Sequence, residues 1–155
     1  MRRFFLFALV FVLYGCEHTG KPNSYALRLH WEDRPARQAR TTREVELPQS
    51  HLVYVVDAQP ILWEGHFTNA ELLQVEEGLC VLLQCNAAGT RELYRQTASN
   101  QGGRLILLVN EEPMGARYVE SPLGDGNLVL FVELPDSEIP AFVSDLKYSL
   151  NQHPA

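Results

Sequence analysis

Four arginines repeat at every third position of one short segment: Arg34, Arg37, Arg40 and Arg43. Three-residue spacing aligns all four on an extended, polyproline-like segment and spreads them slowly around an α-helix. Such a strip of guanidinium groups could contact lipid phosphates or an acidic partner, and each arginine near anionic lipid would add about 1 kcal/mol. The alternative, which we favour, is a solvated loop that lies against the protein's own negative surface.

Cys80 and Cys85 lie in one apolar run, and their spacing argues against a bond between them. Residues five apart on an extended strand point to opposite faces, with α-carbons about 16 Å apart. Free thiols persist best in an oxidising compartment when they are buried, so we expect both in the core. A metal pair or a redox switch would need two-residue spacing and a nearby histidine. The five histidines, at positions 18, 30, 51, 66 and 153, show no metal-ligand interval.

Patterns typical of hydrolytic or acid-base catalysis are missing from the sequence. Ser121, Ser137 and Ser144 lack the Gly-x-Ser-x-Gly elbow that exposes a nucleophile. The adjacent carboxylates at 76–77 and 111–112 are typical of a solvated edge and a turn. We therefore expect a noncatalytic protein without a metal or cofactor. A small envelope enzyme of unknown reaction is the alternative.

The amino terminus has the layout of a secretory signal peptide. Met1-Arg2-Arg3 is cationic, and eleven uncharged residues follow from Phe4 to Tyr14, ahead of Gly15 and Cys16. A helix that spans a bilayer needs roughly 20 apolar residues, so this run is too short for a permanent transmembrane anchor. We predict a signal peptide over residues 1–15.

The run Leu13-Tyr14-Gly15-Cys16 resembles the bacterial lipobox. The resemblance implies cleavage after Gly15 and transfer of a diacylglyceryl group to the Cys16 thiol. Each buried methylene contributes about 0.8 kcal/mol to membrane attachment, so two or three acyl chains make a lasting anchor. Residues 16–24 would then be a lipidated tether, and the protein is expected in the bacterial cell envelope, on the inner or outer membrane, with its domain facing the periplasm. The alternatives are an ordinary cleaved signal and a short buried helix.

Length and charge limit the classes of function. The chain has 155 residues, with 13 Lys and Arg against 19 Asp and Glu and a net charge of −6. Loss of residues 1–15 would leave 11 basic against 19 acidic residues, a net charge of −8. Phosphate polymers repel such a protein, so a nucleic-acid partner is not expected. The length suits one ordinary globular domain.

Alternating and continuous apolar runs predict a series of strands. The first is expected over residues 25–32, where apolar and polar side chains alternate. Further strands are expected at residues 45–47, 52–56, 73–77, 79–85, 105–109, 115–119 and 128–132. Thr68-Asn69-Ala70-Glu71 has the spacing of a capping box and predicts a short turn of helix.

Two longer helices are predicted in the second half. The first spans residues 87–99, with Asn86 as its cap and Leu93, Tyr94 and Thr97 on one face. The second opens at Pro135-Asp136 and carries a helical apolar stripe made of Ile139, Phe142, Val143, Leu146 and Leu150. The fold class is therefore α+β, a mainly antiparallel sheet with two helices packed on one face.

Several motifs follow one another in a recognisable order. They are Gly103-Arg104-Leu105-Ile106-Leu107-Leu108-Val109-Asn110, Met114-Gly115-Ala116, Ser121-Pro122-Leu123-Gly124-Asp125-Gly126 and Pro135-Asp136-Ser137-Glu138. This order resembles the periplasmic head subdomain of SecD, the accessory subunit of protein translocation. We divide the chain accordingly into an N-terminal β region with the arginine-rich loop at 25–59, a SecD head-like α+β domain at 60–150 and a tail at 151–155.

The resemblance implies a noncatalytic head that contacts other polypeptides outside the cytoplasm. It does not extend to the transmembrane bundle of SecD, because no segment after the signal could span a membrane. We expect a polypeptide-binding or assembly module, for which protein export is one possible setting. A purely structural envelope component is a further alternative.

Aromatic residues gather in the first half of the chain: Tyr25, Trp31, Tyr54, Trp63 and Phe67. Most are expected in the core. Any that is exposed beside a free sheet edge would create a peptide-accepting surface, since an extended chain can pair with unpaired backbone groups.

Overall fold

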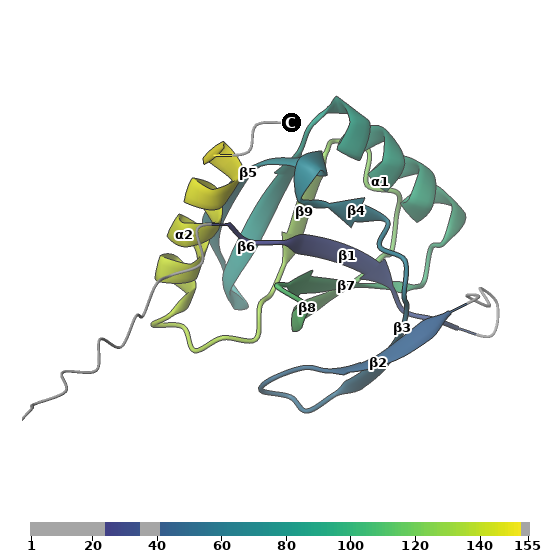
Figure 1. The fold of residues 1–155 in the computed structure, drawn as a ribbon, viewed down its shortest axis with the longest axis horizontal. Coiled ribbons are helices and arrows are strands. Elements are labelled where there is room, and N and C mark those ends of the chain that lie inside the picture. Colours follow the sequence, from purple (N-terminus) through teal and green to yellow (C-terminus); the bar gives the residue numbers. More distant parts are fainter. Residues whose placement is uncertain (1–23, 35–40, 153–155) are drawn as a thin grey trace, which may run out of the picture.

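The computed structural model describes residues 24–34 and 41–152, which fold into antiparallel strands and two helices (Figure 1). In chain order the elements are β1 (Leu27–Trp31), β2 (Thr42–Glu46), β3 (Val53–Asp57), β4 (Leu62–Trp63), the 3-10 turn η1 (Glu64–His66), β5 (Phe67–Val75), β6 (Gly78–Cys85), α1 (Ala87–Ser99), β7 (Arg104–Val109), β8 (Glu112–Tyr118), β9 (Asn127–Leu130) and α2 (Ile139–Gln152). The predicted α+β class is confirmed.

The described strands form two larger sheets and one ribbon. The four-stranded sheet has the order β4-β1-β7-β8, the three-stranded sheet has the order β5-β6-β9, and β2 pairs with β3. All of these pairings are antiparallel. β1 lies between β4 and β7, so a strand from the region 25–59 is an inner strand of a sheet whose other members lie within 60–150.

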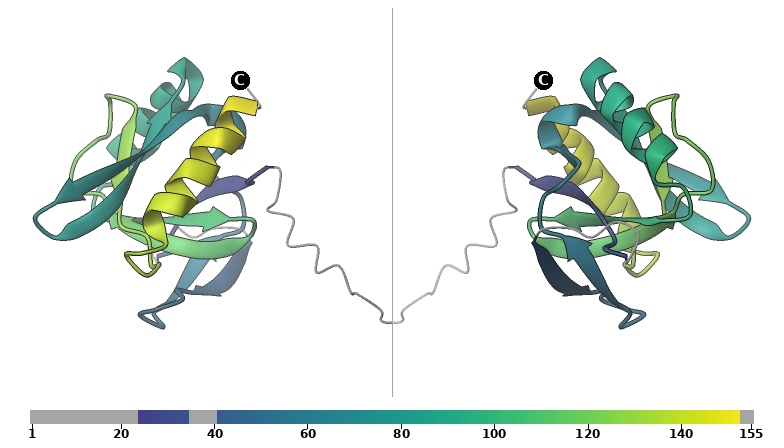
Figure 2. Two further views of the ribbon diagram at one scale, coloured as in Figure 1. Left: turned by 90° about the vertical axis from the view of Figure 1, so that its left-hand side faces the viewer. Right: turned by 90° about the vertical axis from the view of Figure 1, so that its right-hand side faces the viewer.

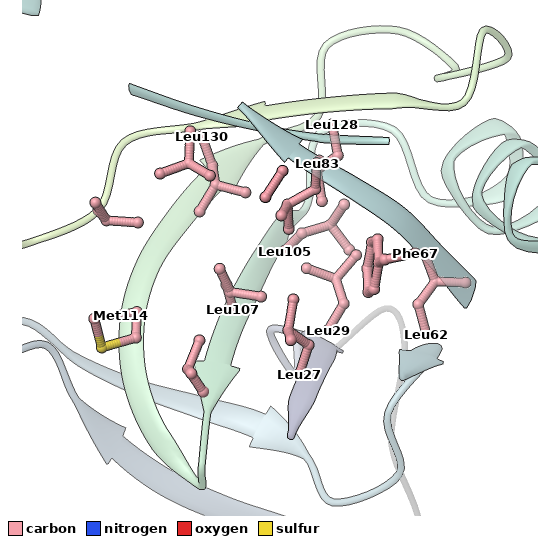
Figure 3. Close-up of a cluster of buried hydrophobic side chains, with 14 of the residues drawn as sticks. Leu27, Leu29, Leu62, Phe67, Leu83, Leu105, Leu107, Met114, Leu128 and Leu130 are labelled. Carbon is pink, nitrogen blue, oxygen red and sulfur yellow. The ribbon is translucent and has the colours of Figure 1, made fainter. Parts of the chain in front are cut away.

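The main core fills the space between the two larger sheets (Figure 3). Leu29 of β1 and Leu107 of β7 meet Phe67 of β5 there, and all three are almost completely buried. The helices add Leu93 from α1 and Ile139, Val143, Leu146 and Leu150 from α2. Both helices therefore lie on the same side of the four-stranded sheet, as predicted. Full burial of each such side chain stabilises the fold by about 1.5–3 kcal/mol.

The β2–β3 ribbon covers the opposite face of the four-stranded sheet. Ile106 and Leu108 of β7 point to that face and pack against Val45 and Val56 of the ribbon. Figures 1 and 2 show the ribbon on the side of the molecule away from α1 and α2. β7 is therefore covered on both faces, which explains its uninterrupted apolar sequence.

The two helices begin and end close to their predicted positions. Asn86 accepts the Gly89 N–H through its side-chain oxygen at 2.8 Å, so α1 starts at the expected cap. Leu93 and Thr97 are fully buried on one face, whereas Tyr94 is 53% exposed and does not belong to that face. α2 starts at Ile139, after a turn in which the Glu138 N–H donates to the Pro135 carbonyl.

The helical turn predicted at residues 68–71 is wrong, because this segment belongs to β5. Asn69 lies opposite Gln84 and Ala70 lies opposite Leu83 of β6. The Thr68 hydroxyl donates to the Gln84 carbonyl at 3.2 Å and the Glu71 carboxylate accepts from the Asn69 side chain, so neither caps a helix. Pairing with the apolar strand β6 therefore overrides a local pattern that favours a helix start.

Candidate functional site

A groove of about 450 Å³ lies between the edge of the four-stranded sheet and helix α1. One side is formed by β4 and the segment that leads into it, and the other by three α1 residues spaced four apart. The lining residues are Asp57, Gln59, Pro60, Ile61, Trp63, His66, Ala88, Glu92 and Gln96. Among the described strands β4 pairs only with β1, and α1 lies beyond its other edge (Figure 1).

Trp63 is the large apolar side chain of this groove. It is 48% exposed, although the strand that carries it also contributes the fully buried Leu62. Its ring meets the His66 ring edge-on, with centroids 3.9 Å apart at 70°. The Trp63 backbone N–H donates to His66 Nδ1 at 3.3 Å, which leaves the neutral imidazole proton on Nε2. The two rings thus form a preformed aromatic surface at the edge of the sheet.

The electrostatics of the groove keep His66 neutral and Glu92 ionised. Burial lowers the pKa of His66, and the nearby charge of Glu92 opposes this only in part. Hydrogen bonds from Arg95 lower the pKa of Glu92 more than burial raises it, and Gln96 donates a further bond. The groove therefore presents an uncharged aromatic pair on the sheet side and a carboxylate on the helix side.

Gln96 ties the helix wall to the first strand. Its side-chain oxygen accepts the Trp31 Nε1–H at 3.1 Å, while its amide donates to Glu92 at 2.8 Å. The remaining wall is fixed by Asp57, whose side chain accepts the Gln59 N–H at 3.0 Å. Both sides of the groove are held by hydrogen bonds.

Behind the groove, a buried histidine joins three elements. His30 is 2% exposed, and its Nδ1 donates to the Asp57 carbonyl at 2.8 Å. Its Nε2 faces Arg43 Nη2 at 3.4 Å, and Arg43 in turn pairs with Glu111 at 2.6 Å. Burial lowers the pKa of His30 although the bond to Asp57 raises it, and the charge of Arg43 lowers it further.

The repeat of Arg34, Arg37, Arg40 and Arg43 forms an arginine ladder, and the members that the structure describes contact the protein itself. Arg34 donates to the Gly102 carbonyl at 2.5 Å, and Arg43 pairs with Glu111. Arg37 and Arg40 lie outside the described residues, as does Cys16. The structure thus separates Arg34 and Arg43 from the groove lining, and any contact of the ladder with lipid or a partner stays a prediction.

The two described cysteines are free thiols. Cys80 is fully buried, and burial raises its pKa. Cys85 is half-buried against the main core, and burial, helped by the charge of Asp125, raises its pKa to about 12. Both are protonated at neutral pH and are poor nucleophiles, since only the thiolate reacts readily.

No group of three or more His, Cys, Asp and Glu side chains within residues 24–34 and 41–152 could hold a metal ion. Neither α1 nor α2 is long and apolar enough to cross a bilayer.

The sequence predicts the strand side of this groove but not its helix side. The aromatic set contains Trp63, and the structure leaves it exposed at a sheet edge, whereas Trp31 and Phe67 are buried. The helix side has a signal in the sequence, namely a four-residue spacing along α1. Ala88, Glu92 and Gln96 share one face at a spacing of four, beside the buried face of α1.

No family model and no curated protein matches the chain. Solved structures do match. SecDF, described as a membrane component that enhances protein export, has a TM-score of 0.60 at 15% identity, with 83% of this chain and 62% of that chain covered. SecDF in its super-membrane-facing form has a TM-score of 0.59 at 15% identity, with 83% and 19% covered. This chain therefore spans less than two thirds of either SecDF chain, and it has the SecD head-like fold that its motif order predicts.

Proposed function

We propose that this protein is a lipid-anchored, noncatalytic module of the bacterial cell envelope that binds extended polypeptide segments between β4 and α1. The observation that carries the proposal is Trp63, half exposed on an edge strand that faces α1 across a groove of about 450 Å³. Because the Trp63 N–H already donates to His66, an incoming chain would bind mainly to the exposed Trp63 ring and the groove walls, which can accept many different side chains. A module of this kind therefore suits diverse, unfolded clients.

The groove chemistry indicates which segments bind best. Trp63 supplies a flat apolar surface for an aromatic or aliphatic side chain, and such aromatic anchors contribute a large share of binding energy. Glu92 and Asp57 line the same groove, so a lysine or arginine near the anchor would gain from their charge. Segments rich in apolar and basic residues are the expected ligands.

The likeness to SecDF supports protein export as the setting. One SecDF structure is described as that of a component that enhances protein export. We propose that this chain serves the same process by holding a segment of a translocated polypeptide. The role that we propose is one of binding alone, and the groove lining contains no serine or cysteine that could act as a nucleophile.

A lipid anchor on Cys16 is the second part of the proposed function. Acylation of Cys16 would attach the domain to the inner or outer membrane through the tether at 16–24, with the groove in the periplasm. Attachment keeps the domain at the membrane surface, where the local concentration of an emerging chain is high.

Binding to a fluorescently labelled, reduced and carboxymethylated protein tests the proposal. Trp63→Ala is expected to weaken binding about tenfold or more, since loss of an aromatic anchor typically costs at least 2 kcal/mol. Trp63→Phe should keep most of the affinity. The matched control is Tyr148→Ala on α2, because Tyr148 is 64% exposed and lies outside the groove.

The affinities are measured by fluorescence anisotropy on purified full-length protein. Weaker binding by Trp63→Ala, with unchanged binding by Tyr148→Ala, supports the groove. Equal affinity of Trp63→Ala and the unaltered protein would overturn it, as would the absence of binding by the unaltered protein.

A further inference from the structure

Strands β8 and β9 lie at the edges of different sheets, and their chain segments touch near Gly115 and Phe131. β8 is the outer strand of the four-stranded sheet and β9 that of the three-stranded sheet. Where they meet, the Glu133 N–H donates to the Met114 carbonyl at 2.7 Å. A β-carbon on Gly115 would lie 2.2 Å from the Phe131 carbonyl oxygen, so the backbones touch there.

Past this contact the two strands leave a slot of about 340 Å³. It is lined by Ala116, Arg117, Tyr118, Val119, Glu120, Ser121, Leu123, Val129, Leu130 and Phe131. β8 and β9 do not pair with each other in the described sheets. Two strand edges therefore face one slot, and an edge without a neighbour is a template for another strand.

Arg117 reaches across the slot from β8 to β9. Its guanidinium donates to the Val129 carbonyl, and its Nε is shielded from solvent without a hydrogen-bond acceptor. Within residues 24–34 and 41–152 no carboxylate forms a salt bridge with Arg117, although the Arg117 charge helps to lower the pKa of Asp125. A buried guanidinium N–H without an acceptor is costly, and a carboxylate, which can accept two parallel hydrogen bonds, satisfies it best.

Two exposed aromatic side chains flank the slot. Tyr118 of β8 is 50% exposed, and Phe131, which follows β9, is 44% exposed. Aromatic rings at a sheet edge supply contact area for the side chains of an added strand.

We infer that the slot between β8 and β9 accepts an extended polypeptide strand that carries a carboxylate opposite Arg117. The strand's backbone replaces the Arg117 guanidinium as the partner of the Val129 carbonyl. The freed guanidinium then pairs with the strand's carboxylate through two parallel hydrogen bonds. This surface shares no residue with the groove at Trp63, so binding at the slot does not depend on the proposed function.

Two synthetic peptides test the inference on the purified full-length protein. Both alternate valine and threonine, and the central residue is glutamate in one and glutamine in the other. The glutamate peptide should bind about tenfold more tightly, as expected for a charge-assisted hydrogen-bonded pair. Hydrogen exchange followed by mass spectrometry should show slower exchange at 116–119 and 128–131 together.

Arg117→Gln should remove the preference for glutamate, while Arg91→Gln, which removes an exposed charge from α1, should keep it. If Arg117→Gln does not fold, the two peptides and the exchange pattern on the unaltered protein decide the question. Equal affinity for the two peptides would overturn the inference. Protection confined to other segments, such as 57–66, would also overturn it, and neither result bears on the Trp63 test.

Discussion

His30 is the single residue at which three parts of the fold converge. It joins β1 to the Asp57 carbonyl of β3 and faces Arg43 of β2, which pairs with Glu111 in the β7–β8 turn. The alternation of β1 places His30 on the polar side of the strand, yet it is buried, because the β2–β3 ribbon covers that side. No local pattern could reveal this, since the cover comes from a different segment.

This network makes stability depend on pH. Because burial lowers the folded pKa of His30 below its ordinary value of 6.5, the neutral form is favoured in the folded state. The contribution of neutral His30 to the free energy of unfolding is complete above the pKa of the unfolded chain, 6.5. This contribution is lost as the pH falls from 6.5 toward the lower pKa of the folded protein. Protonation would also place a positive charge beside Arg43. We expect urea midpoints to fall between about pH 7.5 and about pH 5.5.

His30→Gln should show a smaller loss of stability over the same pH interval. The pH dependence of His66→Gln is measured for comparison. Burial lowers the pKa of His66 as well, but its ring lies at the groove and not in the His30 network. An identical pH dependence for His30→Gln and the unaltered protein would contradict the role given to His30.

Thr97 is a second buried polar residue, and its hydroxyl links helix α1 to the loop at Leu123. Its hydroxyl donates to the Leu93 carbonyl at 2.7 Å and accepts the Leu123 N–H at 2.9 Å, which fastens a loop to α1. Thr97→Val keeps the shape but leaves the Leu123 N–H without its acceptor. The free energy of unfolding should fall by about 1–2 kcal/mol in denaturant titrations. The exposed Thr42→Val should change it by less than about 0.5 kcal/mol.

At the scale of elements, the helices were predictable and one strand was not. α2 shows its apolar stripe within a single segment, and α1 has a capping asparagine at its start. β5 has only scattered apolar residues, and Thr68 and Glu71 imitate a helix start. Its strand form comes from pairing with β6, a contact that depends on both segments. The groove is nonlocal in the same way, since β4 and α1 are separated by two strands.

The contact between β8 and β9 gives a sharp test at this scale. Gly115→Ala would place a methyl group 2.2 Å from a backbone oxygen of Phe131, so one of the two strands must move. We expect a loss of about 2–3 kcal/mol in the free energy of unfolding. At Gly124 the nearest atom to an added methyl is a ring carbon of Tyr94 at 3.2 Å, and this exposed ring can turn away. Gly124→Ala should therefore be nearly neutral, and equal effects of the two variants would contradict the close approach.

At the scale of the whole molecule, we propose an acidic domain that a lipid anchor holds at the membrane. The chain carries a net charge of −6, so the folded part is repelled by anionic lipid unless it is attached. The class and the SecD head-like fold were predictable because helix periodicity and motif order lie within the sequence. The placement of β1 inside the main sheet was not, because it depends on pairing with β7 across more than half of the chain.

Cys16→Ser should release the protein from the membrane fraction, because the anchor depends on the acylated thiol. Mass spectrometry of the unaltered protein should show an acyl adduct on Cys16. Cys85→Ser, which alters a half-buried thiol in β6, should leave attachment unchanged. An unmodified Cys16, or membrane attachment of Cys16→Ser, would contradict the anchor while leaving the groove untouched.

The most direct test of the central claim is a map of backbone amide shifts by nuclear magnetic resonance during titration with an unfolded polypeptide. The account predicts that shifts concentrate at residues 57–66 and along the Ala88, Glu92 and Gln96 face of α1, and that Trp63→Ala removes them. Shifts elsewhere that persist in Trp63→Ala, or no shifts at saturating polypeptide, would contradict a polypeptide-binding groove between β4 and α1.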